Sequence, residues 1–341
     1  MATSDISKPL AAVQIPDRQG RLRPAVKFLL YYRQALVLPV LFVAALILFS
    51  LGAPGFLSAD NLTNVARQSV YLMIVSLGQL VVLIVGGLDL SVGVIAALVS
   101  VVGAMVMAGT FAAMPDYPWL AIGLGILAGA AIGACVGLIN GVGSAIMRIP
   151  PFMMTLGMSS VVFGVALFIG GGVPVYGIPT QFGETFGFGE IAGIPIPTLV
   201  TIALIVCVYF LLEWTRFGRH LYAVGGNLRA AQLSGVRCER VIILAFVIAG
   251  VFAAITGLLL TARLDTGESN IGSSLPLESI AACVIAGVSL AGGVGRTFNV
   301  VLGTVLIMLV QNGLNLMQVG AYASTMAIGA ILIFAMALSR K

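Results

Sequence analysis

The stretch Gly86–Gly93, with the sequence GGLDLSVG, places a carboxylic acid, Asp89, inside a long apolar tract. A carboxylate at the centre of a bilayer costs about 2.5–3.5 kcal/mol on insertion scales, so Asp89 requires a local stabilising interaction. The glycines around it allow the backbone to break a helix and to approach a neighbouring segment closely. Asp89 can then cap a helix that restarts at Leu90, because its carboxylate accepts hydrogen bonds from N–H groups at the positive helix end. A broken helix at membrane depth lines a cavity or is buried in protein, so the stretch indicates either a capped turn or part of a transport path.

Amide side chains within the apolar tracts are the other groups able to bind a polar solute, because an amide both donates and accepts hydrogen bonds. Gln311, Asn312 and Asn315 share one helix face through i, i+3 and i, i+4 spacing, which favours a role in a solute path. Hydrogen bonding between helices is the alternative use of such residues, and it stays open for Gln79, Asn140 and the other amides. The predicted substrate-path residues are Gln79, Asp89, Ser91, Gln311, Asn312 and Asn315.

The residue types that catalysis or metal binding needs are scarce. His220 is the one histidine, so neither a zinc site nor a Ser-His-Asp arrangement can be built. The four cysteines show no metal-ligand or disulfide spacing. Lysines stand only at positions 8, 27 and 341, and none follows a glycine, so the chain has no P-loop for ATP. These features predict that the chain holds no zinc site and no Ser-His-Asp arrangement, and that it does not hydrolyse ATP through a P-loop.

The composition is that of a membrane protein. Of 341 residues, 60% are hydrophobic and 9% are charged, and the mean hydropathy is +1.13. No soluble domain of this size needs that much apolar surface, so we expect an all-α polytopic membrane protein. The net charge of +5 comes from cations in loops and termini, as the positive-inside bias requires, and it indicates no nucleic-acid partner.

About ten apolar tracts are expected to position these residues in the membrane. The tracts are residues 35–51, 65–86, 90–109, 119–139, 152–169, 198–212, 241–262, 278–290, 298–317 and 321–338. We predict a cytoplasmic N-terminal segment, 1–34, followed by a single transmembrane domain, 35–338, with both termini in the cytoplasm. The loop 214–240 is the longest basic stretch and is predicted to be cytoplasmic, whereas 170–197 and 263–277 are predicted to face outward.

Two glycine-rich breaks interrupt these tracts, one near 86–93 and one near 287–295. Paired interrupted segments in two halves of a chain are typical of a substrate path between internal repeats, although chance similarity of glycine-rich runs is an alternative. Whether each segment spans the membrane or re-enters it stays open. The predicted helix-break residues are Gly86, Gly87, Gly93, Gly292 and Gly293.

The basic loop contains the pattern of one short helix. Asn227 is a good N-cap, and Gly235 is a good residue just past the helix end. Two turns of helix are not stable alone in water, so this helix must pack against another surface. Ala230 and Ala231 give it a slim face for docking. The alternative is a helix that lies along the inner surface of its own protein.

Four segments of the chain form a recognisable set. They are GGLDLSVG at 86–93, GLINGVGSAIMRIPPFMMTLGM at 137–158, AVGGNLRAAQLSGV at 223–236 and LESIAACVIAGVSLAGGVG at 277–295. In this order they resemble the membrane permeases of ribose-type, or monosaccharide, ABC importers, and the resemblance runs from near residue 60 to near residue 335. The chain departs from the family pattern at Pro276, where similar members usually carry an acid, and at Ala286, where glycine is usual. Family details of the second broken segment are therefore not carried over.

The resemblance implies the permease subunit of an ATP-driven, binding-protein-dependent importer of a monosaccharide, located in the bacterial inner (plasma) membrane. It implies a permease homodimer surrounded by membrane lipid, a separate ABC ATPase that binds the ATP, and a periplasmic sugar-binding protein that delivers the solute. The stretch Gly86–Gly93 would lie near the path, and the cytoplasmic loop would fit a cleft on the ATPase. By motif, the ATPase-coupling residues are Gly226, Asn227, Arg229, Ala230, Ala231, Leu233 and Gly235. The resemblance also implies that no residue of this chain is catalytic, so that it is not an enzyme, and that the chain itself binds no metal or cofactor.

Other solutes and other classes of protein stay open at this point. Related permeases move nucleosides or other small polar solutes, and whether this permease forms a homodimer or a heterodimer stays open. An ion-coupled secondary transporter usually places several ionisable groups at membrane depth, where this chain offers Asp89 and Glu278. A non-transporting membrane assembly protein is a third class. Selectivity in the resembled family lies largely in the binding protein, so the identity of the sugar stays open too.

Overall fold

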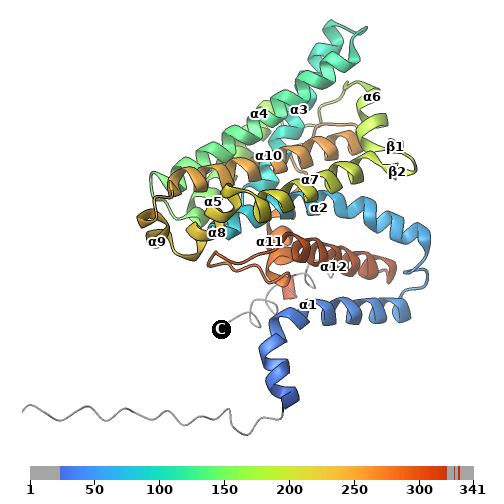
Figure 1. Ribbon diagram of the computed structural model, residues 1–341. Helices are drawn as coiled ribbons and strands as arrows, with labels where there is room; N and C mark the ends of the chain where they lie inside the picture. The colour runs from blue at the N-terminus through green and yellow to red at the C-terminus, as the bar shows by residue number, and fades with distance from the viewer. Residues whose placement is uncertain (1–23, 321–325, 327–328, 331–341) are drawn as a thin grey trace, which may run out of the picture.

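Helices make up nearly all of the structure, a computed structural model that describes residues 24–320, 326 and 329–330 (Figure 1). The long helices are α1 (Pro24–Gly52), α2 (Ala59–Ile84), α3 (Val92–Ala113), α4 (Pro118–Ala145), α5 (Pro151–Gly170), α7 (Ile196–Trp214), α10 (Cys238–Leu264) and α12 (Thr297–Leu316). The shorter helical elements are α6 (Thr180–Phe182), a π-helical turn (Gly183–Gly187), α8 (Arg216–Gly226), α9 (Leu228–Leu233) and α11 (Leu275–Ile285).

Seven of these helices are long and apolar enough to cross a membrane, namely α2, α3, α4, α5, α7, α10 and α12. Two shorter apolar helices, Leu38–Gly52 within α1 and α11, bring the number to nine in the described part of the chain. The tenth predicted tract, 321–338, lies largely outside the described residues, as does most of the predicted segment 1–34. The expected all-α polytopic architecture is confirmed.

Local sequence explains where several helices begin and end. A proline stands in the first turn of α4, α5, α7 and α11, where its missing N–H leaves no helical bond unmade. Ser58 caps α2 by accepting a hydrogen bond from the Asn61 N–H (3.2 Å), and Thr215 caps α8 by accepting from the Gly218 N–H (3.0 Å). α5 ends at Gly171, whose φ of 65° lies in the left-handed region.

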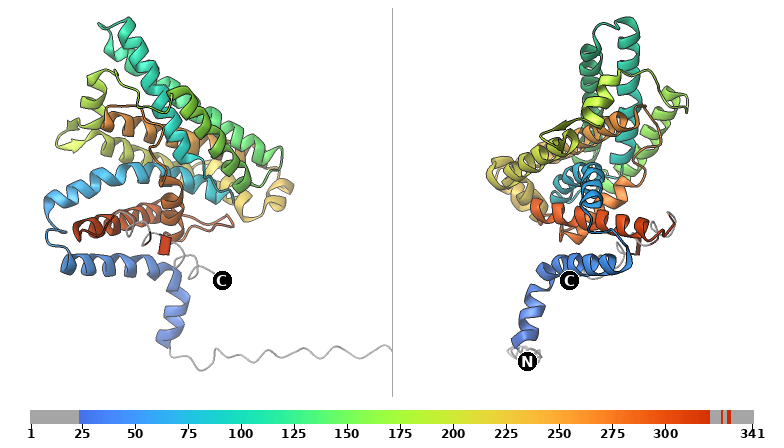
Figure 2. Two further views of the ribbon diagram at one scale, coloured as in Figure 1. Left: turned by 180° about the vertical axis from the view of Figure 1, so that it is seen from behind. Right: turned by 90° about the vertical axis from the view of Figure 1, so that its right-hand side faces the viewer.

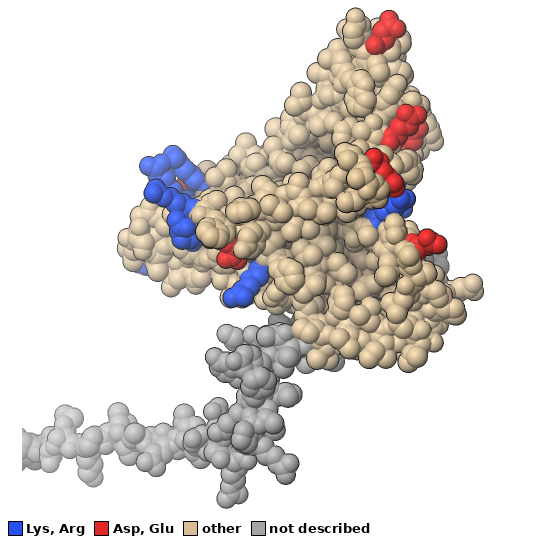
Figure 3. Space-filling model, turned by 45° about the vertical axis from the view of Figure 1, so that its right-hand side comes forward, with Lys and Arg blue, Asp and Glu red and all other residues tan. Residues whose placement is uncertain are grey.

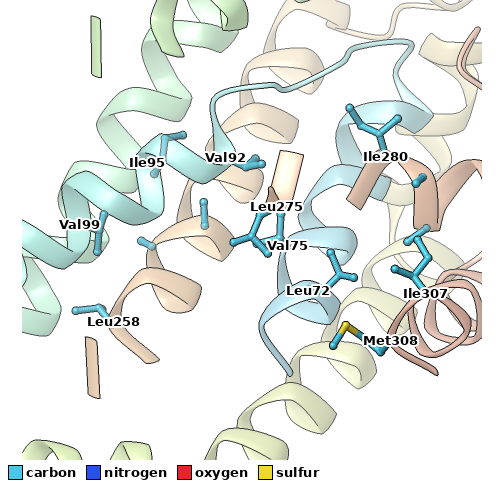
Figure 4. Close-up of a cluster of buried hydrophobic side chains, with 14 of the residues drawn as sticks. Leu72, Val75, Val92, Ile95, Val99, Leu258, Leu275, Ile280, Ile307 and Met308 are labelled. Carbon is cyan, nitrogen blue, oxygen red and sulfur yellow. The ribbon is translucent and has the colours of Figure 1, made fainter. Parts of the chain in front are cut away.

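α10 is the central helix, and α2, α3 and α4 pack around it (Figure 1, Figure 2). Glycine permits the closest approach, because a Cβ on Gly133 of α4 would lie only 2.4 Å from the carbonyl oxygen of Gly250 on α10. One core of buried side chains joins α2, α3, α10, α11 and α12, and it includes Val75, Ile95 and Leu258 (Figure 4). The four helices that flank the two breaks therefore meet in one core.

A small antiparallel hairpin holds the two strands found among the described residues, and the sequence did not indicate it. β1 (Glu190–Ile191) pairs with β2 (Ile194–Pro195) inside the predicted outer loop. The two turn residues, Ala192 and Gly193, have φ values of 53° and 78°, as a type I′ turn requires.

Most charged side chains gather by sign at two ends of the molecule, although a basic group also lies at the acidic end and an acidic group at the basic end (Figure 3). The basic end holds α8, α9 and the loops beside them, and its arginines are Arg148, Arg216, Arg219, Arg229, Arg237, Arg240 and Arg296. The acidic end holds the hairpin and the opposite helix ends, and its acids are Asp60, Asp116, Glu184, Glu190, Asp265 and Glu268. The predicted cytoplasmic loop 214–240 thus lies at the end opposite the predicted outer loop 170–197.

Candidate functional site

The first break forms where α2 ends and the chain turns back along it. α2 ends at Ile84, and Gly86 follows with a φ of 78°, in the left-handed region that favours glycine. The Gly87 N–H then donates to the last turn of α2 (3.0 Å). The chain continues as a non-helical segment to Ser91, and α3 begins at the next residue. The predicted break is present between two helices that are each long enough to cross a membrane, but the predicted break residue Gly93 lies in the first turn of α3.

Side chains from α2 and α5 hold the segment 88–90 in place. Thr155 Oγ1 lies 2.9 Å from the carbonyl oxygen of Leu88, and Ser159 Oγ lies 3.0 Å from that of Leu90, so each hydroxyl can donate to the segment. Each hydroxyl also reaches a carbonyl oxygen of its own helix, that of Pro151 (3.0 Å) for Thr155 and that of Thr155 (2.8 Å) for Ser159. The amide of Gln79, in the orientation that satisfies both of its ends, donates to the Asp89 carbonyl oxygen (3.1 Å) and accepts from the Asp89 N–H (3.2 Å). Non-helical backbone at membrane depth needs such partners. We term Gln79, Thr155 and Ser159 the backbone clamp.

Thr155 and Ser159 were not predicted as site residues. A signal for them exists in the sequence, because two hydroxyl side chains four residues apart share one face of an apolar helix. The same pattern also fits hydroxyl groups that bond to their own helix, so it does not point to the segment 88–90.

The Asp89 carboxylate bonds to Ser91 and not to a free helix end. Its Oδ1 accepts from the Ser91 N–H (2.8 Å) and from Ser91 Oγ (2.6 Å), and Ser91 Oγ accepts from Asn140 Nδ2 (2.8 Å). The prediction that Asp89 caps a helix restarting at Leu90 is wrong. α3 begins two residues later, at Val92, because the backbone clamp holds the carbonyl group of Leu90 outside the helix.

Gln79, Asp89, Ser91 and Asn140 form one buried polar cluster in which every residue is 0% exposed. Three predicted path residues thus lie together, with Asn140 as a fourth member from α4. Oδ2 of Asp89 and Oδ1 of Asn140 have no hydrogen-bond partner among the described residues. Because the cluster is closed to solvent, it shapes the break in this conformation and offers no surface to a solute.

The other three predicted path residues lie apart from that cluster, on α12. Gln311 donates to Glu278 Oε1 on α11 (3.0 Å). Asn312 and Asn61 of α2 exchange two hydrogen bonds (2.8 and 2.9 Å), while Asn315 is exposed. Two of the three amides therefore bond between helices here, which was the alternative use of such residues.

The second break lies between α11 and α12 and contacts the first. Its glycines adopt left-handed φ values, which are 81° at Gly287, 92° at Gly292 and 74° at Gly293. The Gly293 N–H donates to the carbonyl oxygen of Ile84, the last residue of α2 (2.9 Å). The predicted second break is present, and it is a turn that lies against the end of α2.

A re-entrant segment precedes α11 and was not predicted. After α10 the chain runs back along α3, because a Cβ on Gly267 would lie 2.7 Å from the carbonyl oxygen of Ser100 and a Cβ on Gly93 would lie 2.3 Å from that of Gly272. The segment 263–277, predicted to face outward, therefore enters the fold over part of its length. This path explains why α11 has only 11 residues.

Gly225, near the end of α8, touches both breaks. A Cβ on Gly225 would lie 1.7 Å from the carbonyl oxygen of Ile84 and 2.6 Å from the amide nitrogen of Gly293, so only glycine permits this approach. Tyr222 donates its hydroxyl to the carbonyl oxygen of Gly295 (2.8 Å). Burial raises the pKa of Tyr222 to about 12, so the hydroxyl keeps its proton at neutral pH. We term the contact of Ile84, Gly225 and Gly293 the glycine junction.

α9 follows the glycine junction directly, and its predicted caps are confirmed. Asn227 Oδ1 accepts from the Ala230 N–H (2.9 Å) at the start of the helix. At its end, Gly235 has a φ of 82°, and the N–H groups of Gly235 and of the next residue bond back to the helix (3.0 and 3.1 Å). This pair of bonds is a Schellman motif.

The side chains that α9 presents outward differ from the expected ones. Ala231 is 4% exposed and packs into the protein's own core, so it does not belong to a free docking face. Leu233 is 85% exposed and Leu228 is 46% exposed, while Arg229 and Ala230 are exposed beside them. The outward apolar surface of α9 is therefore formed mainly by its two leucines.

Comparisons with known proteins identify one family and a set of similar permeases. The family described as branched-chain amino acid transport system / permease component matches residues 61–336. The ribose import permease protein RbsC of Bacillus subtilis (strain 168) is 36% identical over 297 residues, which cover 86% of this chain and 89% of that protein. The D-allose transport system permease protein AlsC of Escherichia coli (strain K12) is 35% identical over 302 residues, 88% of this chain and 90% of that protein. The galactose/methyl galactoside import permease protein MglC of Escherichia coli (strain K12) is 36% identical over 322 residues, 91% of this chain and 95% of that protein. No solved structure matches the chain.

Proposed function

The chain belongs to the family of permease components of carbohydrate-uptake ABC transporters, and from this premise we propose that it is the membrane subunit of an ATP-driven, binding-protein-dependent importer of a monosaccharide. The relatives at 35–36% identity are named for ribose, D-allose and galactose or methyl galactoside. Permease components of this family are transport subunits without catalytic activity.

The position of α9 is the observation that supports this function most. Leu233 is an apolar side chain that is 85% exposed on a short helix among arginines, and such a side chain gains stability when a partner covers it. α9 also follows directly after Gly225, which is in backbone contact with both helix breaks. A partner that displaces α9 would therefore displace both breaks through the glycine junction.

We infer the partners and the orientation from the same features. A separate ABC ATPase would dock on α9 and bind the ATP, and a periplasmic sugar-binding protein would deliver the solute at the acidic end. Two copies of the permease would form a homodimer in the inner membrane. The basic end and both termini would lie in the cytoplasm, because arginine and lysine concentrate in cytoplasmic loops.

Substitution of Leu233 tests the docking role of α9. We expect Leu233→Asp to weaken co-purification of the ATPase and to abolish ATP-driven uptake into liposomes that also contain the binding protein. The control is Ile191→Asp, a change at an apolar residue that is 60% exposed in the hairpin at the other end. Ile191→Asp should leave ATPase association unchanged. Normal ATPase association of Leu233→Asp would show that α9 is not the docking element.

The solute class is tested in the same liposomes with the unsubstituted permease. Ribose, allose and galactose are offered separately, together with leucine, because the matching family is described for branched-chain amino acids. We expect ATP-dependent uptake of at least one sugar. Uptake of leucine and of none of the sugars would contradict the monosaccharide assignment.

A further inference from the structure

The outer part of α2, from Asp60 to Tyr71, carries a polar face that plays no part in either break. Six of the eight polar side chains of this part fall within about a third of the helix circumference, namely Asp60, Asn61, Asn64, Arg67, Gln68 and Tyr71. The other two, Thr63 and Ser69, lie outside this arc, and their hydroxyl groups donate to carbonyl oxygens of their own helix (2.8 Å each). This face lies at the acidic end, whereas the glycine junction lies at the other end of the same helix.

Neighbouring elements occupy both edges of the polar face. On one edge, Asn61 bonds to Asn312 of α12 through two hydrogen bonds (2.8 and 2.9 Å). On the other edge, Arg67 forms a salt bridge with Glu190 of the hairpin. Asn61 and Arg67, at the two edges, therefore already have hydrogen-bond or ion-pair partners within the chain.

The middle of the polar face is open. Gln68 Nε2 donates to Asn64 Oδ1 (2.9 Å), and this is the one hydrogen bond of either side chain among the described residues. Asn64 is exposed and Gln68 is half-buried. Asn64 Nδ2 and Gln68 Oε1 thus offer a donor and an acceptor to a molecule outside the chain.

Contacts between α2 and α10 close the inner limit of the face. Tyr71 is buried, and the guanidinium carbon of Arg263 from α10 lies 5.5 Å from the centre of its ring. Two turns further along α2, a Cβ on Gly78 would lie 3.1 Å from Ala249 Cα on α10. The open polar surface therefore ends near Tyr71, where the two helices seal against each other.

Lipid is an unfavourable neighbour for this open face. Polar side chains of membrane helices face a bundle interior or a water-filled cavity, because their transfer into hydrocarbon is costly. By contrast, α5 and α7 expose large apolar side chains along their length, such as Phe163, Phe168 and Val206. The open face of α2 must border water or another protein chain.

We propose that the open face of α2, centred on Asn64 and Gln68 with Arg263 at its inner limit, lines an aqueous outer vestibule that receives a neutral, polyhydroxylated solute. The solute class rests on the proposed function. Each hydroxyl group of such a solute both donates and accepts a hydrogen bond, and the two free amide groups match this pattern. The vestibule leads to the sealed contact of α2 and α10, so the solute waits there until the helices separate.

Thiol labelling tests the aqueous surface without requiring transport. In a background without the exposed native cysteines, a membrane-impermeant maleimide is added from the outside to the permease assembled with its ATPase. We expect Asn64→Cys and Gln68→Cys to react at rates comparable with Ala192→Cys in the hairpin turn. Leu127→Cys, at a residue that is 67% exposed on the apolar surface of α4, should react far more slowly. Equally slow reaction at positions 64 and 68, or disulfide formation there between two copies, would overturn the vestibule.

Uptake measurements test the solute class. Loss of one hydrogen bond to an uncharged group corresponds to about a two- to tenfold effect, so Gln68→Leu should slow sugar uptake by that factor. Gln68→Asn should restore part of the rate, and Leu62→Ala, on the opposite face of α2, should leave it unchanged. Rapid labelling at 68 combined with unchanged uptake in Gln68→Leu would refute a solute contact. Absence of sugar uptake by the unsubstituted permease would instead refute the proposed function. The labelling rates would still show whether positions 64 and 68 line an aqueous vestibule.

Discussion

At the scale of single residues, the first break is held by hydrogen bonds that local sequence does not supply. Asp89 Oδ1 receives two hydrogen bonds from Ser91, and Asn140 extends the same network from α4. Thr155 and Ser159 reach the break from α5. Buried polar groups that are satisfied in this way fix a single backbone path, because any other path would leave some of them unpaired.

Asp89 is predicted to shape the break through its acceptor oxygen. Asp89→Asn keeps an oxygen that can accept from Ser91, so it should retain most of the folded protein and of the uptake per folded molecule. Asp89→Ala leaves the Ser91 N–H and hydroxyl buried without this acceptor, which costs about 1–3 kcal/mol, so less folded protein should be recovered. An Asn variant that assembles normally but transports nothing would assign the carboxylate a role in the transport cycle.

Thr155 is predicted to stabilise the fold through the backbone clamp. Thr155→Val keeps the side-chain volume but removes the donor to the carbonyl oxygen of Leu88, and we expect a loss of about 1–3 kcal/mol of stability. The matched control is Thr201→Val on α7, because the buried hydroxyl of Thr201 bonds only to the carbonyl oxygen of Pro197 in its own helix (2.9 Å). The melting temperatures of the two variants in detergent provide the comparison. A larger decrease for Thr201→Val would contradict the importance of the clamp.

At the scale of elements, α8 and α9 form an arm that is attached to both breaks. The attachment consists of the backbone contact of Gly225 with Ile84 and Gly293, together with the hydrogen bond from Tyr222 to Gly295. When one of these segments moves, the others must move with it, because their backbones are in direct contact and no flexible side chain lies between them. Movement of α9 at the basic end is therefore expected to reach α2 and the turn before α12.

Gly225→Ala tests this mechanical link. The added Cβ would lie 1.7 Å from the carbonyl oxygen of Ile84, so the arm must move away from both breaks. We expect the variant to retain ATPase binding, because α9 remains exposed, and to lose most of its uptake. Gly164→Ala on α5 is the control, since nothing lies within 4 Å of the added Cβ and the residue belongs neither to the junction nor to the predicted coupling residues, and it should retain both properties. Normal uptake by Gly225→Ala would show that the junction transmits no motion.

At the scale of the whole molecule, the separation of charge defines two unlike ends. Seven arginines against Glu213 and Glu239 lie in and beside α8 and α9, whereas the hairpin end carries six acids against Arg67 and Arg263. The surface of the outer vestibule also differs from the arginine-rich surface of the basic end, because it consists of amide side chains and paired charges. Such unlike ends would suit the two proposed partners, an ATPase at the basic end and a solute-delivering protein at the acidic end.

Reporter fusions test the orientation of these ends. A fusion at Arg229 in α9 should report a cytoplasmic location, and one at Gly189 beside the hairpin should report the opposite side. The physical reason is the positive-inside bias, which retains arginine-rich loops in the cytoplasm. Matching signals at the two positions would contradict the assigned topology.

The sequence by itself determined the helical membrane architecture, the positions of the two breaks and the caps of α9. These features depend on local properties, namely hydropathy over a helix length, the φ values open to glycine, and the hydrogen bonds that Asn227 and Gly235 make with neighbouring residues. The four motifs also indicated the permease family, which the comparisons confirmed.

Only the tertiary structure decided which distant groups meet at the site. It placed Thr155 and Ser159 on the backbone of the first break, moved the start of α3 past Leu90, and buried Ala231 against its own protein. It also left the middle of the polar face of α2 open. Each of these outcomes depends on the packing of segments far apart in the chain, because hydropathy and spacing state that a polar group needs a partner but not which partner is in reach.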